Sequence, residues 1–158
     1  MNLPVETHDD LVDMPGHLIR RLQQIAVAIF LEDMGEFGVT PVQYAVLRSL
    51  RGMPGIDQRS LAAKVGLDTS TLGGVVDRLE TRGWVSRQPS EADRRVKQLL
   101  LTPTGLQLLK DMEPALQKSQ QRILAPLSDK KQVQFLKLLA ELVEKNNDLS
   151  RAPIPSDA

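Results

Sequence analysis

Residues 58–102, the stretch that decides the fold, read QRSLAAKVGLDTSTLGGVVDRLETRGWVSRQPSEADRRVKQLLLT. A first helix is predicted over residues 58–65, because Gly66 tolerates the left-handed conformation that commonly closes a helix at its C-terminus. Asp68 follows at once, and its side chain can accept an unpaired backbone N–H at the start of a second helix. Two helices joined by so short a turn containing a glycine are typical of a helix-turn-helix.

The second predicted helix has one apolar face and one small, polar face. Its apolar residues recur at three- and four-residue steps, which places them on one stripe against a core. They are Leu72, Val75, Val76 and Leu79. The opposite face carries Thr69, Ser70, Gly73, Gly74, Asp77 and Arg78. The DNA major groove is about 12 Å wide and is read by short hydrogen-bonding side chains, so this pattern predicts a recognition helix.

Two glycines, Gly73 and Gly74, interrupt the interior of this helix. Each costs about 1 kcal/mol of helix stability relative to alanine. Either a close backbone approach at this point compensates for that cost, or the helix becomes firm only when it is bound.

A hairpin is predicted directly after the recognition helix. One strand opens at Trp84, residues 89–93 have the composition of a turn, and residues 96–101 read as the returning strand. The tip of the hairpin presents Arg94 and Arg95. Because guanidinium groups suit phosphates and narrow minor grooves, the hairpin is interpreted as a DNA-binding wing.

The wing resembles the D-x-R-x5-L-T-x2-G signature of the MarR family of bacterial transcriptional regulators. The matching residues are Asp93, Arg95, Leu101, Thr102 and Gly105, and residues 76–85 are similar to the end of that family's recognition helix. The resemblance implies a winged helix-turn-helix fold and a DNA-binding regulator. It also implies that small aromatic acids or phenols bind between the dimer helices and the head.

Four further helices are predicted before and after the helix-turn-helix and its wing. One runs from Asp9 or Asp10 to about Met34, with a break or restart at Pro15–Gly16. A capping threonine, a proline and a glutamine mark the start of a helix at residues 40–43, which ends at Gly52, and residues 53–56 read as a loop. A capping threonine followed by proline also begins a helix at Thr102–Pro103, and a kink is expected in it at Pro114. Ser128–Asp129 starts the last helix.

The predicted fold is therefore mainly α with a small β wing. Residues 37–102 form the winged helix-turn-helix, which we call the head. Residues 9–36 and 103–149 form a helical dimerisation region, which we call the arm, and this region has more apolar residues than one chain can cover. Residues 1–8 and 150–158 read as loose ends. A two-fold dimer is the economical arrangement, and it places two heads on half-sites about 34 Å apart in a pseudo-palindromic operator.

Charge is unevenly distributed although the formal net charge is zero. Residues 1–36 contain seven acids and two bases, whereas residues 58–97 contain eight bases and five acids. The surplus of basic residues therefore lies on the helix-turn-helix and its wing. The absence of cysteine excludes thiol chemistry and cysteine metal sites. The acidic N-terminus and the lack of any long apolar run indicate no signal peptide, no membrane partner and a cytoplasmic location.

The predicted DNA-binding residues come from both helices and from the wing. They are Ser60, Thr69, Ser70, Thr71, Gly73, Arg78, Arg94, Arg95 and Lys97. The alternatives are that the hydroxyls serve only as cap and turn residues and that the cations form a solvated hairpin tip. Asp93 is expected to brace the wing by pairing with an arginine.

A second set of residues suggests a binding site for an anionic ligand. His17, Arg20, Arg21 and Gln24 share one helical face, and Tyr44 and Arg48 on the next helix are placed to complete the site. Guanidinium pairs bidentately with carboxylate, which favours an anionic ligand. The family resemblance implies that this ligand is a small aromatic or heteroaromatic acid. Residues 14–21 resemble the opening of regulators of aromatic and hydroxynicotinate-type acid degradation. Surface charge with interface salt bridges is the alternative.

Catalysis finds little support in the sequence. The two histidines, His8 and His17, lack partners at metal-ligand spacing, and a metal site with Asp9, Asp10 and Asp13 is the weakest interpretation. We expect no enzyme activity, no metal and no cofactor. The predicted partners are double-stranded DNA, a second copy of the chain and a small aromatic acid. The alternative function is a winged-helix module that docks protein without an effector.

Overall fold

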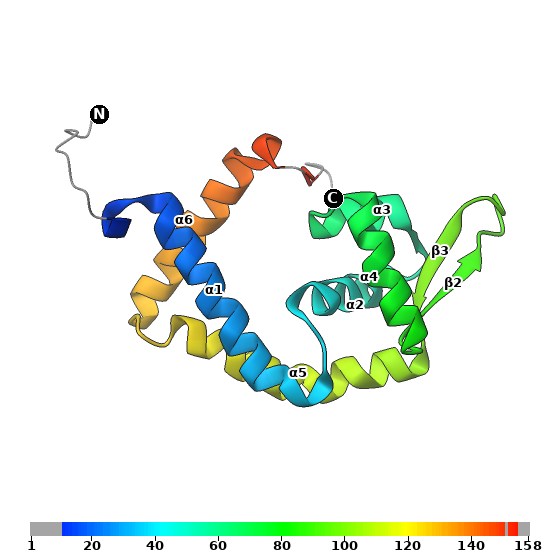
Figure 1. Ribbon diagram of the computed structural model, residues 1–158, viewed down its shortest axis with the longest axis horizontal. Coiled ribbons are helices and arrows are strands. Elements are labelled where there is room, and N and C mark those ends of the chain that lie inside the picture. The colour runs from blue at the N-terminus through cyan, green and yellow to red at the C-terminus, as the bar shows by residue number, and fades with distance from the viewer. Residues whose placement is uncertain (1–10, 151, 155–158) are drawn as a thin grey trace.

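The computed structural model describes residues 11–150 and 152–154. The helices are α1 (Pro15–Met34), α2 (Pro41–Gly52), α3 (Gln58–Val65), α4 (Thr69–Thr81), α5 (Pro103–Leu124) and α6 (Asp129–Lys145). The strands are β1 (Ile56–Asp57), β2 (Val85–Pro89) and β3 (Lys97–Leu101). In Figure 1 the head, with its projecting β2–β3 hairpin, lies on the right, α1 and α6 lie on the left, and α5 joins them along the bottom. The predicted mainly helical winged helix-turn-helix fold is confirmed.

Helix α1 begins later than the earliest predicted start. It starts at Pro15, after a short 3-10 turn at Leu11–Asp13, while Asp9, Asp10 and the predicted loose segment 1–8 lie outside the described residues. Proline suits the first helical position, where its missing N–H is not needed. The residue before it, Met14, is extended, as expected because the proline ring disfavours the α conformation there. The restart at Pro15 is the alternative that the structure supports.

The head helices begin at the caps predicted for them. Thr40 and Gln43 form a complete capping box, with the Gln43 backbone N–H donating to Thr40 Oγ1 at 3.2 Å and the Thr40 N–H donating to Gln43 Oε1 at 3.0 Å. The carboxylates of Asp57 and Asp68 accept backbone N–H groups at the starts of α3 and α4. Gly66 closes α3 with a φ of 67°, so the short turn of the helix-turn-helix forms as expected.

The wing sheet has three strands, whereas two were predicted. Strand β1 pairs antiparallel with β3, placing Ile56 opposite Leu99, and β2 pairs with the other edge of β3 from Val85 to Pro89. The prediction that residues 53–56 form a loop is therefore wrong at Ile56. A strand of two residues carries no alternating pattern, which explains why the sequence does not reveal it.

The core joins the head to both α1 and the first half of α5. The apolar stripe of α4 is buried as predicted, and Leu109 and Met112 of α5 and Phe30 and Met34 of α1 complete the same cluster. Farther along, α5 packs on α1. Helix α5 runs uninterrupted through Pro114, so the proline neither ends nor splits the helix.

An ion-pair cluster fixes α1 against the second half of α5. The Asp33 side chain is only 2% exposed, and its Oδ1 lies 3.0 Å from Lys118 Nζ and 2.7 Å from an Arg122 nitrogen. The hydrogen bond from Lys118 lowers the pKa of Asp33, burial opposes that change, and Arg122 reinforces it. The carboxylate therefore stays charged and pairs the two helices.

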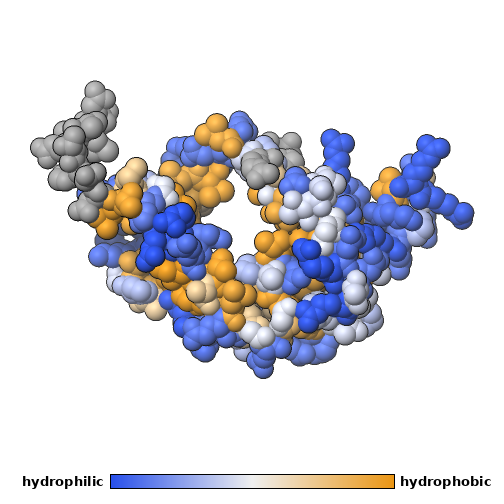
Figure 2. Space-filling view, in the orientation of Figure 1, coloured by the Kyte–Doolittle hydropathy of each residue, from blue (hydrophilic) through white to orange (hydrophobic). Residues whose placement is uncertain are grey.

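Helix α6 leaves its apolar side uncovered. None of its residues is buried, and Ser128 occupies the cap position without a side-chain hydrogen bond. A cavity of about 570 Å³ lies between α1, α5 and α6, with walls that include Leu22, Ile123 and Leu139. Figure 2 shows apolar side chains gathered around the central opening, between the arm and the head.

The described part of the C-terminal tail folds back toward the head. Ile154 exchanges two hydrogen bonds with the Asn147 side chain, at 2.8 and 2.9 Å. Ala152 and Ile154 also approach Gly66 in the turn between α3 and α4, as a methyl group built there would lie 4.0 Å from each. Residues 151 and 155–158 of the predicted loose tail lie outside the described residues.

Candidate DNA-binding and effector sites

Two of the predicted DNA-contact hydroxyls take part in helix caps. Ser60 Oγ donates to Asp57 at 2.6 Å, and Thr71 Oγ1 donates to Asp68 at 2.6 Å. The Ser60 hydroxyl, followed by its backbone N–H, lowers the pKa of Asp57. Both hydroxyls are exposed and keep their acceptor lone pairs, so capping and contact with DNA are compatible roles.

The outward face of α4 is small and open, as predicted for a recognition helix. Thr69, Ser70 and Arg78 are exposed. Gly73 lies beneath the Gln58 side chain, because a methyl group built on Gly73 would lie 3.2 Å from Gln58 Nε2. Gln58 Nε2 also donates to the Thr69 carbonyl at 3.4 Å. The close approach at Gly73 therefore comes from the end of a flexible side chain, and among the described residues no backbone from another element lies within 4 Å of such a methyl group.

Arg87 of β2 ties the wing to the recognition helix, a role that the sequence did not reveal. Its guanidinium contacts Asp77 at 2.6 Å and also pairs with Glu80, both on α4. Burial opposes the charge of Arg87, but the bonds to Asp77 and Glu80 outweigh it and raise the pKa of the guanidinium. The only local signal was a cation placed seven residues after Glu80, which says nothing about distance in space. These two ion pairs, which we call the Arg87 clamp, fix the orientation of the wing relative to α4.

The tip of the wing carries three exposed cations. Arg94, Arg95 and Lys97 are exposed, and within residues 11–150 and 152–154 none of them forms an ion pair. Asp93 was predicted to pair with an arginine side chain, but its Oδ1 accepts the backbone N–H of Arg95 at 2.9 Å instead. Among the described residues it pairs with no guanidinium group. The arginine side chains are thereby left available to an external anion such as a DNA phosphate.

The base of the wing is fixed to the end of α4. Arg82 stacks over the Trp84 ring at 4.1 Å and donates to the Gly38 carbonyl at 2.6 Å. Thr102 Oγ1 donates to the Gly83 carbonyl at 2.6 Å, and the Thr102 N–H donates to the Trp84 carbonyl at 3.1 Å. Arg82 was not predicted as a structural residue, because its contact with Gly38 joins residues 44 positions apart.

The predicted effector residues form two separate groups within one protomer. On α1, Arg20 donates to His17 Nδ1 at 3.3 Å, and Arg20, Arg21 and Gln24 are exposed. On α2, Arg48 donates to the Tyr44 hydroxyl at 3.3 Å, and the Tyr44 ring lies 6.1 Å from that of Phe30. Among the described residues, no hydrogen bond or ion pair joins the α1 group to the α2 group. The two groups are therefore not bonded to each other within one protomer, and their joining in one effector site stays a prediction.

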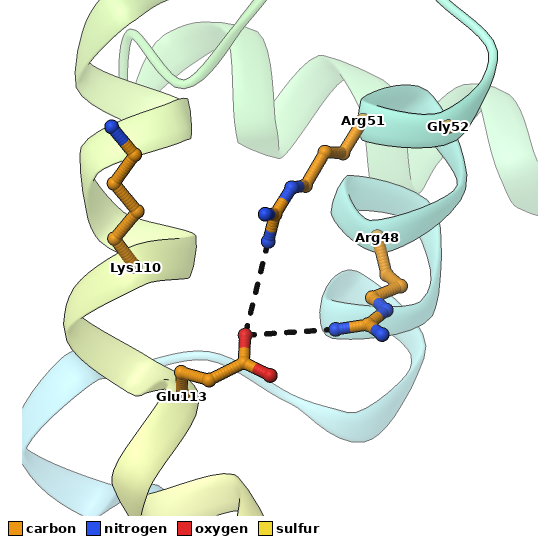
Figure 3. A pocket seen from close by; sticks show the side chains of 5 residues that line it. All are labelled: Arg48, Arg51, Gly52, Lys110 and Glu113. Atoms are coloured by element: carbon orange, nitrogen blue, oxygen red, sulfur yellow. Dashed lines mark ion pairs between the residues drawn. The ribbon is translucent and has the colours of Figure 1, made fainter.

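Arg48 of the α2 group borders a cavity of about 630 Å³ that opens to solvent between α2 and α5. Figure 3 shows Arg48 and Arg51 of α2 directed toward Glu113 of α5, with Lys110 one turn earlier on the same helix. Arg51, Lys110 and Glu113 were not predicted as site residues, because their proximity arises only from the packing of α5 on the head.

In the part of the chain that the structure describes, no three histidine, aspartate or glutamate side chains gather as metal ligands. His8, Asp9 and Asp10, which belong to the metal site that the sequence supports least, lie outside the described residues. Of the helices described, none has the length and apolar character needed to cross a bilayer.

Residues 39–97 match the MarR family model, and they extend from just before α2 to the start of β3. A putative transcriptional regulatory protein for the hcr operon of Thauera aromatica is 32% identical over 142 residues. That alignment covers 89% of this chain and 86% of the relative.

Solved structures of two similar regulators share the fold. BpsR of Bordetella bronchiseptica, studied for regulation of its DNA binding by 6-hydroxynicotinic acid, is 29% identical, with a TM-score of 0.80 over 84% of this chain and 95% of that one. The transcriptional repressor CouR, bound to a 23-mer DNA duplex, is 27% identical, with a TM-score of 0.81 over 85% and 96% of the two chains. CouR from Rhodococcus jostii RHA1 has also been solved with p-coumaroyl-CoA.

Proposed function

Because this chain belongs to the MarR family of transcriptional regulators, we propose that it works as a homodimeric repressor that a small aromatic acid releases from a pseudo-palindromic operator. The family makes it a DNA-binding regulator and not an enzyme. Repression, the dimer, the operator symmetry and the effector are the proposed parts. The alternative, a module that docks protein without an effector, is less favoured because the similar CouR was solved on DNA.

The DNA-binding role is supported by one observation, the slim exposed face of α4 beside a wing tip whose cations form no ion pair with any described residue. In the proposed complex Thr69, Ser70 and Arg78 face base edges, while Arg94 and Arg95 neutralise phosphates or enter the minor groove. Ser60, Thr71, Gly73 and Lys97 border the same contact. The Arg87 clamp supports this arrangement, because helix and wing then meet the duplex as one rigid unit.

The dimer is supported by the uncovered apolar side of α6. Exposed Leu136, Leu138, Leu142 and Val143 share this helix, and Leu18 and Ile19 of α1 are also exposed. Contiguous apolar surface of this kind is typical of an interface. We assign α1, α5 and α6 to dimerisation and residues 37–102 to DNA binding, so that two-fold symmetry presents two heads to one duplex.

The effector is proposed to be an aromatic or heteroaromatic carboxylate held by His17, Arg20, Arg21 and Gln24. Tyr44 and Arg48 complete the site only if dimerisation or a head movement brings residues 17–24 of α1 to this part of α2. The effect of 6-hydroxynicotinic acid on BpsR supports this ligand class. The ligand need only prefer a head spacing that misfits the operator, since a coupling of about 1–3 kcal/mol lowers affinity about five- to 150-fold.

Replacing Arg95 with alanine is expected to weaken operator binding and to reduce the slope of log affinity against log salt by about one unit, because one phosphate contact is lost. The measurement is a fluorescence anisotropy titration of DNA from the protein's own upstream region at several salt concentrations. Lys131→Ala, which removes an exposed cation from α6, is the matched control and should keep the wild-type slope. An unchanged slope for Arg95→Ala would count against its phosphate contact, and no specific DNA binding by wild type would favour the protein-docking alternative.

Arg20→Ala is expected to abolish thermal stabilisation by the effector while leaving DNA affinity unchanged, because a guanidinium that pairs with the ligand carboxylate is lost and the head is untouched. Thermal shift against a panel of aromatic and heteroaromatic carboxylates identifies the ligand. The panel includes 6-hydroxynicotinate. If Arg20→Ala is stabilised as strongly as wild type, the effector site lies elsewhere.

A further inference from the structure

A glutamine of α3 reaches across to the recognition helix. Gln58 is the first residue of α3, directly after the cap residue Asp57. Its Nε2 donates to the Thr69 carbonyl at 3.4 Å and would lie 3.2 Å from a methyl group built on Gly73. Thr69 and Gly73 are one helical turn apart, so they lie on the same face of α4. The amide of Gln58 therefore lies over this face, at a place where α4 supplies no side chain of its own.

This amide lies at the end of α4 from which bases are read. In helix-turn-helix proteins the N-terminal residues of the second helix contact base edges in the major groove. Thr69 is the first residue of α4, and it is exposed. A side chain that lies over the first turn of α4 is therefore placed to enter the groove together with that helix.

The amide keeps the hydrogen-bonding groups that recognition of a base requires. A glutamine amide has two N–H donors on its nitrogen and one carbonyl oxygen. One N–H of Gln58 is used by the Thr69 carbonyl, and no other described residue donates to Gln58 Oε1. One donor and one acceptor therefore remain. Adenine presents N7 as an acceptor and N6 as a donor in the major groove, and glutamine pairs bidentately with these two atoms.

Gly73 gives this amide its room. A methyl group at Gly73 would lie 3.2 Å from Gln58 Nε2, closer than the roughly 3.5–4.0 Å at which nonbonded heavy atoms normally rest. At the next residue, Gly74, a methyl group would meet only Arg78 Nη1, at an ordinary 3.8 Å. Gly73→Ala would therefore shift the Gln58 amide, whereas Gly74→Ala would leave it in place.

We propose that Gln58 of α3 is a specificity-determining residue that reads an adenine of the operator across the space that Gly73 leaves open on α4. Gln58 Nε2 donates to adenine N7 and Oε1 accepts from adenine N6, while the other N–H stays on the Thr69 carbonyl. The neighbouring helix thus supplies the base contact that Gly73 cannot make. The contact rests on the DNA-binding part of the proposed function and on neither the effector nor the direction of control.

The test measures base preference with the full-length protein. Fluorescence anisotropy compares the shortest specifically bound duplex from the protein's own upstream region with duplexes in which each base pair is replaced in turn. In wild type, replacing one A·T pair of a half-site should lower affinity at least about fivefold, the weaker end of what a bidentate base contact contributes. Gln58→Met keeps the length of the side chain without its amide. It should remove the penalty at that base pair and keep the penalties at all others.

Gln58→Glu tests the chemistry of the contact, because a loss of packing cannot change which base is preferred. A carboxylate of nearly the same shape can only accept hydrogen bonds, and cytosine N4 is a donor in the major groove. The preferred base at this position should therefore change from adenine to cytosine, whatever the effect of the added charge on overall affinity.

Gly73→Ala should reduce the adenine preference in wild type and should reduce it no further when Gln58→Met is already present. Gly74→Ala is the matched control for the added methyl group. Gln121→Met makes the same loss of an amide at an exposed position of α5 and controls for it. Both control variants should keep the adenine preference.

The same adenine preference in wild type, Gln58→Met and Gln58→Glu would overturn the proposal. A loss of affinity in Gln58→Met that is equal for every duplex would also overturn it, because Gln58 would then only position α4. If Gln58→Met binds too weakly to titrate, the base preferences of Gln58→Glu and Gly73→Ala decide. Specific binding with unchanged preferences in these variants contradicts base reading by Gln58 and leaves the proposed function intact. No specific DNA binding by wild type would overturn the proposed function, and base reading by Gln58 with it.

Discussion

Leu142→Glu is expected to convert the protein to a monomer and to lower its operator affinity at least about 100-fold, because the second head then no longer binds at the high effective concentration that a dimer provides. Leu142 is 55% exposed in the single chain and lines the cavity between α1, α5 and α6. In a proposed interface it becomes buried, where an unpaired carboxylate is strongly unfavourable. The same substitution on an uncovered surface would alter stability by no more than about 0.5 kcal/mol.

The measurement pairs analytical ultracentrifugation with an operator titration. Gln134→Glu makes the same change from a neutral residue to an acid on an exposed polar position of α6, and it is expected to remain dimeric with wild-type affinity. Circular dichroism checks that both variants keep their helices. If the Leu142→Glu protein stays dimeric and binds the operator normally, α6 is not part of the dimer interface, and another surface must form the dimer.

The elements predicted correctly are those whose signals lie within a few residues of one another. The capping box at Thr40, the cap at Asp68 and the left-handed Gly66 each act locally, and the structure confirms all three. The apolar stripe of α4 was also predictable, because a buried helix face repeats along the chain. Local chemistry thus sufficed for the helix-turn-helix and for the position of the wing.

The features missed depend on contacts between distant segments. Strand β1 exists because β3 offers a free edge to Ile56, and the Arg87 clamp exists because β2 folds back beside α4. The cavity with Glu113 requires α5 to pack on α2. The effector site with residues on α1 and α2 stays a prediction, since among the described residues of one protomer no hydrogen bond or ion pair joins the two groups.

Gly105→Ala is expected to destabilise the fold by about 3 kcal/mol or more, at the upper end of what overpacking costs. Gly105 is buried in the first turn of α5, and a Cβ built there would lie 2.1 Å from the Trp84 carbonyl oxygen and 3.0 Å from its carbon. Those atoms are backbone and cannot rotate away. The same oxygen accepts the Thr102 N–H at 3.1 Å, so moving it also breaks the bond that closes the base of the wing.

This clash gives a physical reason for the last glycine of the wing signature, because α5 can leave the sheet at this angle only where a residue without a side chain passes Trp84. Gly16→Ala is the matched control: nothing lies within 4 Å of a methyl group there, and removal of a helical glycine should add up to about 1 kcal/mol of stability. Urea unfolding of both variants, followed by circular dichroism, measures the free energies of unfolding. If Gly105→Ala folds too poorly to titrate, a lower melting temperature gives the same answer. A Gly105→Ala protein as stable as wild type would show that α5 can shift away from the wing, and the rigid junction between wing and arm would then be wrong.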